Sequence, residues 1–258
     1  MISPSGGLCA QDPTGDALLV RAACGDAAVL AQFRARHAAG EPAAYVAGFL
    51  VFRGRRFLSD PRAYVTDPEL TYLVDQVHLE SEALRRRLGR APRVLEFGTG
   101  AGTLALTLAL ERLEAQLMGI DLDAQALALA RENAALHGLD FPVWESDYFS
   151  GLPPAVQPPD LLFGDPPWGG PTDLYDTERD GSYYDRMPAK SAYPGGPSPC
   201  GIHDELIRRV ATLGWPTVLV LNYGVLPEAE VRRSASPLAH ARLLHPRPEL
   251  TLLVGCAR

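Results

Sequence analysis

One stretch decides the fold of this chain: Arg93-Val94-Leu95-Glu96-Phe97-Gly98-Thr99-Gly100-Ala101-Gly102. Its first half is a short apolar run, which is typical of a buried strand. The glycines at every second position allow the backbone to turn sharply and to approach a ligand closely. We therefore predict a strand, a glycine turn and the beginning of a helix. A G-x-G-x-G pattern alone is a weak signal, so a ligand site at this turn needs support from the rest of the chain.

Strand-like and helix-like segments alternate beyond this turn. Predicted helices cover Thr103–Leu113, Ala124–His137 and Ile202–Leu213. The predicted strands are Gln116–Ile120, Phe141–Trp144, Leu161–Phe163 and Thr217–Leu221, followed by a closing antiparallel pair at Ala241–Leu244 and Thr251–Val254. Strands that alternate with helices predict an α/β fold with a parallel sheet and right-handed crossovers.

The chain before the glycine turn shows two kinds of pattern. Apolar residues recur at helical intervals from Asp16 to His37, with a break at Gly25-Asp26, and the β-forming run Phe49–Phe52 favours a hairpin. Asp67-Pro68-Glu69 has the composition of a helix start. We expect a short helical and hairpin region at residues 1–66 and one α/β domain at residues 67–258.

Composition excludes several classes of protein. The chain is 47% apolar and 21% charged, with a net charge of −7, so a general nucleic-acid binder is disfavoured. Its apolar runs are far shorter than the ~20 residues of a membrane span, and residues 1–12 lack the pattern of a secretory signal. The four cysteines show no C-x-x-C spacing, so neither a metal site nor a disulfide framework is predicted. These features favour a cytoplasmic protein.

Acidic residues follow the predicted strands at the ends where ligands bind in open α/β sheets. Asp121 stands 23 positions after Gly98, where an acid accepts hydrogen bonds from ribose hydroxyls. Asp147 can accept from an adenine amino group, with Tyr148 beside it to cover the ring. The pattern predicts a nucleoside pocket. Its expected cofactor contacts are Glu96, Gly98, Thr99, Gly100, Gly102, Asp121, Leu122, Asp147 and Tyr148.

Charge decides which nucleoside cofactor is expected. The dinucleotide fingerprint G-x-G-x-x-G needs a third glycine where this chain has Thr103. Glu96 would repel a pyrophosphate, whereas it suits the cationic methionine end of S-adenosylmethionine. We therefore expect S-adenosylmethionine as cofactor, with S-adenosylhomocysteine as product, rather than NAD.

The fourth predicted strand runs into Asp165-Pro166-Pro167-Trp168. The prolines fix the backbone and remove two donors, and an ionised Asp165 only accepts hydrogen bonds. The Asp165 carboxylate and the Pro166 carbonyl can hold both hydrogens of an NH2 group, while Trp168 offers a flat face for a planar acceptor. We take Asp165, Pro166 and Trp168 as candidate catalytic residues and Pro167 as a substrate contact. An ordinary turn after a strand is the plain alternative.

Residues 169–201 lack periodicity and are rich in Gly, Pro and Tyr, as in a lid or binding loop. Tyr175, Tyr183 and Tyr184 are the candidates in this loop to close over the acceptor. The competing interpretation is that these three are solvated loop tyrosines.

The chain resembles the HemK/PrmC-type methyltransferases, which modify the glutamine amide of release factors. Glu41-Pro42-Ala43-Ala44-Tyr45-Val46-Ala47-Gly48 is similar to the family's E-P-x-A-Y-x-x-G segment, Glu96–Gly102 to its cofactor loop, and Asp165–Trp168 to its N-P-P-Y motif. Pro188, Ala189, Ala192 and Gly195-Gly196 faintly resemble a later family loop. The resemblance implies a Rossmann-like class I methyltransferase fold, with a seven-stranded, mostly parallel sheet flanked by helices.

The departures from the family pattern bear on the acceptor. Asp165 and Trp168 stand where the family has Asn and Tyr, and Asp67 stands where it has Arg. A carboxylate favours an amino or guanidino donor over an amide. The preferred hypothesis is therefore an N-methyltransferase for a small planar acceptor in secondary metabolism. The alternatives are a release factor glutamine methyltransferase, a nucleic-acid amino methyltransferase and an inactive cofactor-binding module.

Overall fold

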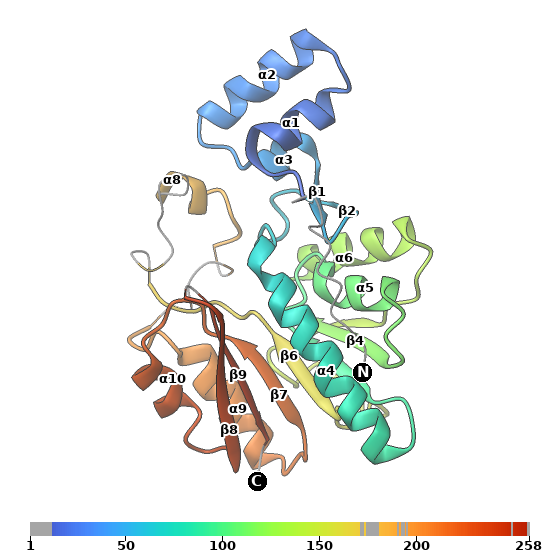
Figure 1. Ribbon diagram of the computed structural model, residues 1–258, viewed down its shortest axis with the longest axis vertical. Helices are drawn as coiled ribbons and strands as arrows, with labels where there is room; N and C mark the ends of the chain where they lie inside the picture. The colour runs from blue at the N-terminus through green and yellow to red at the C-terminus, as the bar shows by residue number, and fades with distance from the viewer. Residues whose placement is uncertain are drawn as a thin grey trace.

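The computed structural model describes residues 12–170, 173, 181–189, 191, 194, 196–248 and 250–256. A seven-stranded sheet forms its centre, in the order β5-β4-β3-β6-β7-β9-β8 (Figure 1). The strands are β3 (Arg93–Phe97), β4 (Gln116–Asp121), β5 (Val143–Glu145), β6 (Leu161–Gly164), β7 (Val218–Asn222), β8 (His240–Arg247) and β9 (Leu250–Cys256). Strands β3 to β7 pair in parallel, and β9 pairs antiparallel with both β7 and β8. The predicted parallel sheet and its closing antiparallel pair are confirmed.

Helices cover both faces of the sheet because successive strand residues point to opposite sides. Val94 belongs to the apolar core shared with α4 (Thr71–Leu88), α5 (Thr103–Leu110) and α6 (Ala124–Leu136), and the one-turn helix η1 (Pro68–Leu70) leads into α4. The next residue, Leu95, belongs to the core shared with α9 (Gly201–Thr212) and α10 (Glu228–Ser234). The sequence did not predict α10, and α5 ends three residues before the predicted Leu113. Among the described residues, no helix is both long and apolar enough to span a bilayer.

The N-terminal helices stand apart from the sheet, at the top of Figure 1. They are α1 (Gly15–Ala23), α2 (Ala27–Ala38) and α3 (Ala43–Ala47), followed by the hairpin strands β1 (Phe49–Phe52) and β2 (Arg55–Leu58). Asp26 begins α2 by accepting hydrogen bonds from the amides of Ala28 and Val29, which explains the break predicted at Gly25-Asp26. The short helix α8 (Gly181–Tyr184) lies in the segment predicted as a lid.

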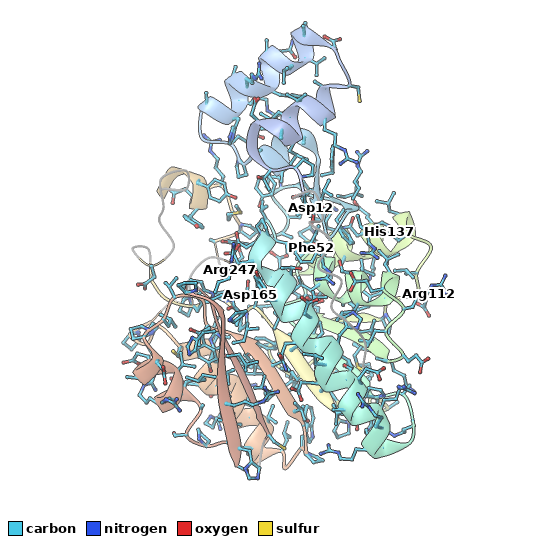
Figure 2. The ribbon with its side chains drawn as sticks, in the orientation of Figure 1. Asp12, Phe52, Arg112, His137, Asp165 and Arg247 are labelled. Carbon is cyan, nitrogen blue, oxygen red and sulfur yellow. The ribbon has the colours of Figure 1, made fainter. Side chains whose placement is uncertain are left out.

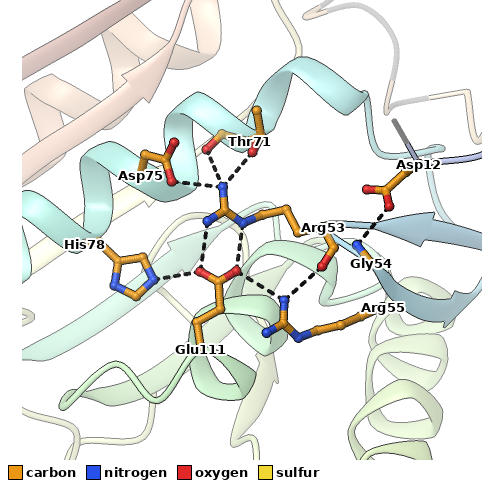
Figure 3. A network of polar contacts seen from close by, with 8 residues as sticks. All are labelled: Asp12, Arg53, Gly54, Arg55, Thr71, Asp75, His78 and Glu111. Atoms are coloured by element: carbon orange, nitrogen blue, oxygen red, sulfur yellow. Dashed lines mark hydrogen bonds and ion pairs between the residues drawn. The ribbon is translucent and has the colours of Figure 1, made fainter. Parts of the chain in front are cut away.

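An ion cluster joins the β1–β2 turn to α4 and to the end of α5 (Figure 3). Arg53 donates to Glu111 at 2.8 and 3.2 Å and to Asp75 at 2.8 Å, while the Thr71 hydroxyl accepts at 2.6 Å. Arg55 and His78 also contact Glu111, at 3.1 and 2.9 Å. The Glu111 side chain is only 16% exposed, so these bonds are poorly screened by solvent. The cluster fixes the hairpin against the sheet domain.

Replacing Glu111 with alanine should lower the free energy of unfolding by about 2 kcal/mol, since two partly buried arginines would lose their common acceptor. Urea denaturation measures the change. Glu82→Ala is the control, because its ion pairs with Arg85 and Arg86 are exposed and their loss should cost less than about 1 kcal/mol. Equal losses in the two variants would contradict the prediction.

The same cluster makes part of the stability depend on pH. Burial alone would raise the pKa of Glu111, but hydrogen bonds from Arg53 and His78 hold it below its usual value. A carboxyl with a lowered pKa in the folded state stabilises the fold above its unfolded pKa. That contribution is lost as the pH falls through the lowered pKa.

Candidate active site

The carboxyl ends of the parallel strands meet at one edge of the sheet and enclose a cavity of about 970 Å³. The register places Phe97 opposite Ile120 on one side and opposite Gly164 on the other, so the residues that follow these strands come together. Among the described residues, seven acids and one arginine line the cavity; the acids are Asp67, Glu96, Asp121, Asp123, Glu145, Asp147 and Asp165. The arginine, Arg62, already bonds to Asp60 and Glu132. The wall is therefore strongly acidic and suits a cation.

The glycine turn is held on the end of β4 by its own backbone. The amides of Gly98 and Thr99 both donate to the Ile120 carbonyl, at 2.9 and 3.0 Å. The Gly100 amide donates to Asp121 at 2.8 Å, and Gly100 has φ +52°, a left-handed conformation that glycine adopts without strain. These contacts bring the turn and the predicted ribose acid to the same wall of the cavity.

Gly102 does not line the cavity, although the sequence predicts it as a cofactor contact. A Cβ added at Gly102 would lie 3.3 Å from Ala130 of α6 and 3.1 Å from Leu106 of α5. The third glycine thus permits α5 and α6 to pack closely. The structure therefore relates the missing side chain of Gly102 to helix packing.

Glu96 is buried at the base of the cavity, with 2% of its surface exposed. Its Oε2 atom accepts from the Thr99 hydroxyl at 2.6 Å and from the Ala105 amide at 3.3 Å. Burial, together with the charges of Asp121 and Asp165, raises the pKa of Glu96 to about 8 against these bonds. A cation beside Glu96 would favour the ionised carboxylate.

The residues predicted to hold an adenosine line one wall together. Leu122 is half exposed and lines the cavity with Asp121 and Asp147. The Tyr148 ring packs against Phe97 with centroids 5.3 Å apart, and the Arg209 guanidinium lies 4.3 Å from its centre. This wall combines an apolar surface with carboxylate acceptors, which is what a purine riboside needs.

Asp165 follows β6 and lies near the start of α4 (Figure 2). It lines the same cavity as the glycine turn. Asn222, at the end of β7, donates to its Oδ1 atom at 2.7 Å. Burial, together with the charges of Asp67 and Glu69, raises the pKa of Asp165 to about 7, although hydrogen bonds from Asn222 and Trp168 oppose the rise. Pro166, Pro167 and Trp168 line the cavity beside it. The structure therefore brings the Asp-Pro-Pro-Trp motif and the glycine turn to one site.

The predicted tyrosines behave differently. Tyr184 is 4% exposed and packs in an aromatic cluster with Tyr45 and Met187, so neither it nor its neighbour Tyr183 lines the cavity. Tyr64 stacks on Tyr184 with ring centroids 6.5 Å apart, and it lines the cavity where the sequence predicts the loop tyrosines. Tyr175 lies outside the described residues.

Sequence reasoning missed several residues at this site, among them Tyr64 at the cavity wall and Asn222 beside Asp165. Tyr64 comes from the segment between the hairpin and α4, and nothing in its neighbourhood signals a ligand. Asn222 directly follows the predicted strand Thr217–Leu221, so the rule that ligand residues follow strand ends would have found it.

Comparison with known proteins supports the fold assignment. Residues 72–171 match the family model described as the methyltransferase small domain. A solved methyltransferase of Pyrococcus furiosus superposes with a TM-score of 0.52 at 14% identity, over 78% of this chain and 87% of that one. A T. thermophilus 16S rRNA N2 G1207 methyltransferase, solved with AdoMet and guanosine, gives a TM-score of 0.50 at 17% identity, over 81% of this chain and 50% of that one. The chain has the Rossmann-like class I methyltransferase fold that the sequence predicts.

The similarity in sequence is more specific. Release factor glutamine methyltransferase of Deinococcus radiodurans is 42% identical over 133 residues, which are 52% of this chain and 45% of that protein. The chain spans about half the length of the curated relatives it matches. The match relates its methyltransferase domain to the HemK/PrmC-type enzymes and confirms the resemblance seen in the motifs. The name of this relative gives a release factor glutamine as its methyl acceptor. The comparison therefore does not support the small-molecule acceptor preferred from the sequence.

Proposed function

We propose that this chain is an S-adenosylmethionine-dependent N-methyltransferase and that its acceptor is a glutamine amide of a protein. The observation that carries the proposal is the single cavity shared by the glycine turn, Asp121 and the Asp165–Trp168 clamp. The similarity to release factor glutamine methyltransferases supports the choice of acceptor.

The residues present fit the cofactor. Asp121 would accept from the ribose hydroxyls, Asp147 would accept from the adenine amino group, and Leu122 would pack against the purine. The buried Glu96 would face the cationic methionine end, where its carboxylate stabilises positive charge. S-adenosylmethionine would supply an electrophilic methyl group at this site.

The clamp would orient the acceptor nitrogen. The Asp165 carboxylate and the Pro166 carbonyl would each accept one hydrogen of the amide NH2, which holds the nitrogen toward the methyl group. The new N–C bond forms as the S–C bond breaks, and the nitrogen gives up one proton. We assign that proton to Asp165, because its raised pKa makes it a better proton acceptor than an ordinary aspartate.

An amino or guanidino group is the second candidate acceptor, because the clamp contains the carboxyl group of Asp165. Asp165 stands beside the charges of Asp67 and Glu69, an arrangement that favours a positively charged donor group. The two candidates therefore differ in the charge of the acceptor nitrogen.

The test is methyl transfer from labelled S-adenosylmethionine to release factors, with small amines and guanidines offered in parallel. Tandem mass spectrometry should place one methyl group on a glutamine side chain, and a factor with that glutamine changed to glutamate should stay unlabelled. Label on an amino or guanidino nitrogen alone would replace the glutamine proposal with the second candidate.

Cofactor affinity should rise with pH toward about 8 and then level off, because the ionised form of Glu96 attracts the sulfonium cation. Binding below that pH then releases a proton. Calorimetry at pH 7 in two buffers of different ionisation enthalpy measures this release. Glu96→Gln should reduce this proton release. Undiminished proton release in that variant would refute the assignment to Glu96.

A further inference from the structure

We propose that Asn222, together with Gly224, is the element that positions both halves of the acceptor clamp, Asp165 and Trp168. This inference rests on the proposed function, in which the clamp holds the acceptor nitrogen. Asn222 ends β7, which pairs with β6, the strand that Asp165 directly follows. It contacts the clamp residue directly without itself lining the cavity. Its role is therefore that of a positioning residue.

The Asn222 amide has one orientation that satisfies both of its ends. Its Nδ2 atom donates to Asp165 Oδ1 at 2.7 Å, while its Oδ1 atom accepts from the Gly224 amide at 2.9 Å. In the flipped orientation, the Asn222 NH2 group would face the Gly224 N–H, and the Asn222 carbonyl oxygen would face the Asp165 carboxylate. Neither pair can form a hydrogen bond. The residue is 3% exposed, so water does not offer an alternative partner. The side chain thus fixes which oxygen of Asp165 is engaged and from which direction.

Gly224, in the same turn as Asn222, determines how closely the Trp168 indole can approach the backbone. A Cβ at Gly224 would lie 1.9 to 2.4 Å from three carbons of the Trp168 ring, closer than any packed contact. The ring therefore lies directly on the Gly224 backbone. Since the Gly224 amide is held by Asn222, one side chain determines the position of both clamp residues.

The turn is anchored from behind by α9. His203 is buried, and its Nε2 atom bonds to the Asn222 carbonyl at 2.8 Å. Its ring lies against Tyr223 with centroids 4.0 Å apart. Burial lowers the pKa of His203 to about 4, so the ring is neutral near pH 7 and its Nε2 atom is the donor to that carbonyl. The support of the clamp is thus a rigid, uncharged unit.

The decisive readout is the protonation of Asp165. Its hydrogen bond from Asn222 favours the ionised carboxylate, so loss of that bond raises the pH at which Asp165 ionises. Infrared difference spectra, with Asp165→Asn as reference, follow this carboxyl when no acceptor is present. In Asn222→Ala the titration should move upward by about one pH unit. In Asn222→Asp it should move further, because a second carboxylate faces the first.

The acid limb of the rate of methyl transfer should move by the same amount. The rate at pH 7 should fall about 10- to 100-fold, because the acceptor nitrogen is misaligned. Cofactor affinity should stay at the wild-type value in both variants. Asn222→Asp keeps the acceptor for the Gly224 amide and nearly the same volume, so it tests the idea even where Asn222→Ala does not fold.

Thr217→Val is the matched control, at the opposite end of β7. Thr217 is fully buried and donates to the Pro159 carbonyl at 2.7 Å, so its loss costs stability without touching the clamp. Thr217→Val should lower the melting temperature. It should leave the infrared titration of Asp165 and the acid limb of the methyl-transfer rate unchanged. Asn222 variants that bind cofactor with wild-type titration and rate would overturn the inference. A wild-type enzyme that methylates no amide, yet shows the infrared shift on substitution, would refute the proposed function and leave the positioning role standing.

Discussion

Replacing Asp165 with alanine should lower the rate of methyl transfer by at least about 100-fold, because the acceptor nitrogen loses both an anchor and its proton acceptor. Single-turnover experiments with labelled S-adenosylmethionine measure this rate apart from product release. Cofactor binding should persist, since the ribose acid Asp121 and the glycine turn hold the other part of the cavity.

Asp165→Asn is the informative partner of this variant. It places at the clamp the amide found in the family motif, and it can still accept one hydrogen of an NH2 group. A glutamine acceptor should therefore tolerate it better than alanine, whereas a cationic acceptor should lose its counter-charge. An alanine variant with the wild-type rate would remove Asp165 from the mechanism.

Replacing Asp121 with alanine should weaken cofactor binding by about 10- to 100-fold, since hydrogen bonds to a charged group contribute ~1.5–3 kcal/mol. The loss has two sources. Asp121 would no longer accept from the ribose, and the Gly100 amide would lose the partner that holds the turn in place. Calorimetric titration with S-adenosylmethionine measures the dissociation constant.

Asp140→Ala controls for the loss of one negative charge. Asp140 is exposed, lies between α6 and β5, and does not line the cavity. Its removal should leave the dissociation constant close to that of wild type. An equal loss of affinity in both variants would show that Asp121 acts only through the overall charge.

Periodicity and strand-end chemistry predicted the sheet and most of the cavity wall. Glu96, Asp121, Asp147 and Asp165 lie far apart in sequence, yet each lies at or just beyond the carboxyl end of a strand. Parallel strands bring such positions to one edge of the sheet. The rule needs only the strands and their direction. For that reason the fold class and these four acids could be read from the chain.

Contacts across the sheet could not be read in the same way. The bond between Asn222 and Asp165 joins residues 57 positions apart, and it depends on β6 and β7 being neighbours. Sequence patterns identify strands without giving their order. Gly102 shows the complementary difficulty, because a glycine needed for helix packing and one needed for ligand approach look alike in a turn.

In the proposed reaction, the acid-rich cavity would also favour the exchange of S-adenosylhomocysteine for S-adenosylmethionine. Transfer of the methyl group removes the sulfonium charge, so attraction to the carboxylates of the wall weakens at the moment the reaction is complete. Electrostatics would then promote departure of S-adenosylhomocysteine and entry of its charged precursor. The acidic wall that would retain S-adenosylmethionine would thus also speed turnover, most strongly at low ionic strength.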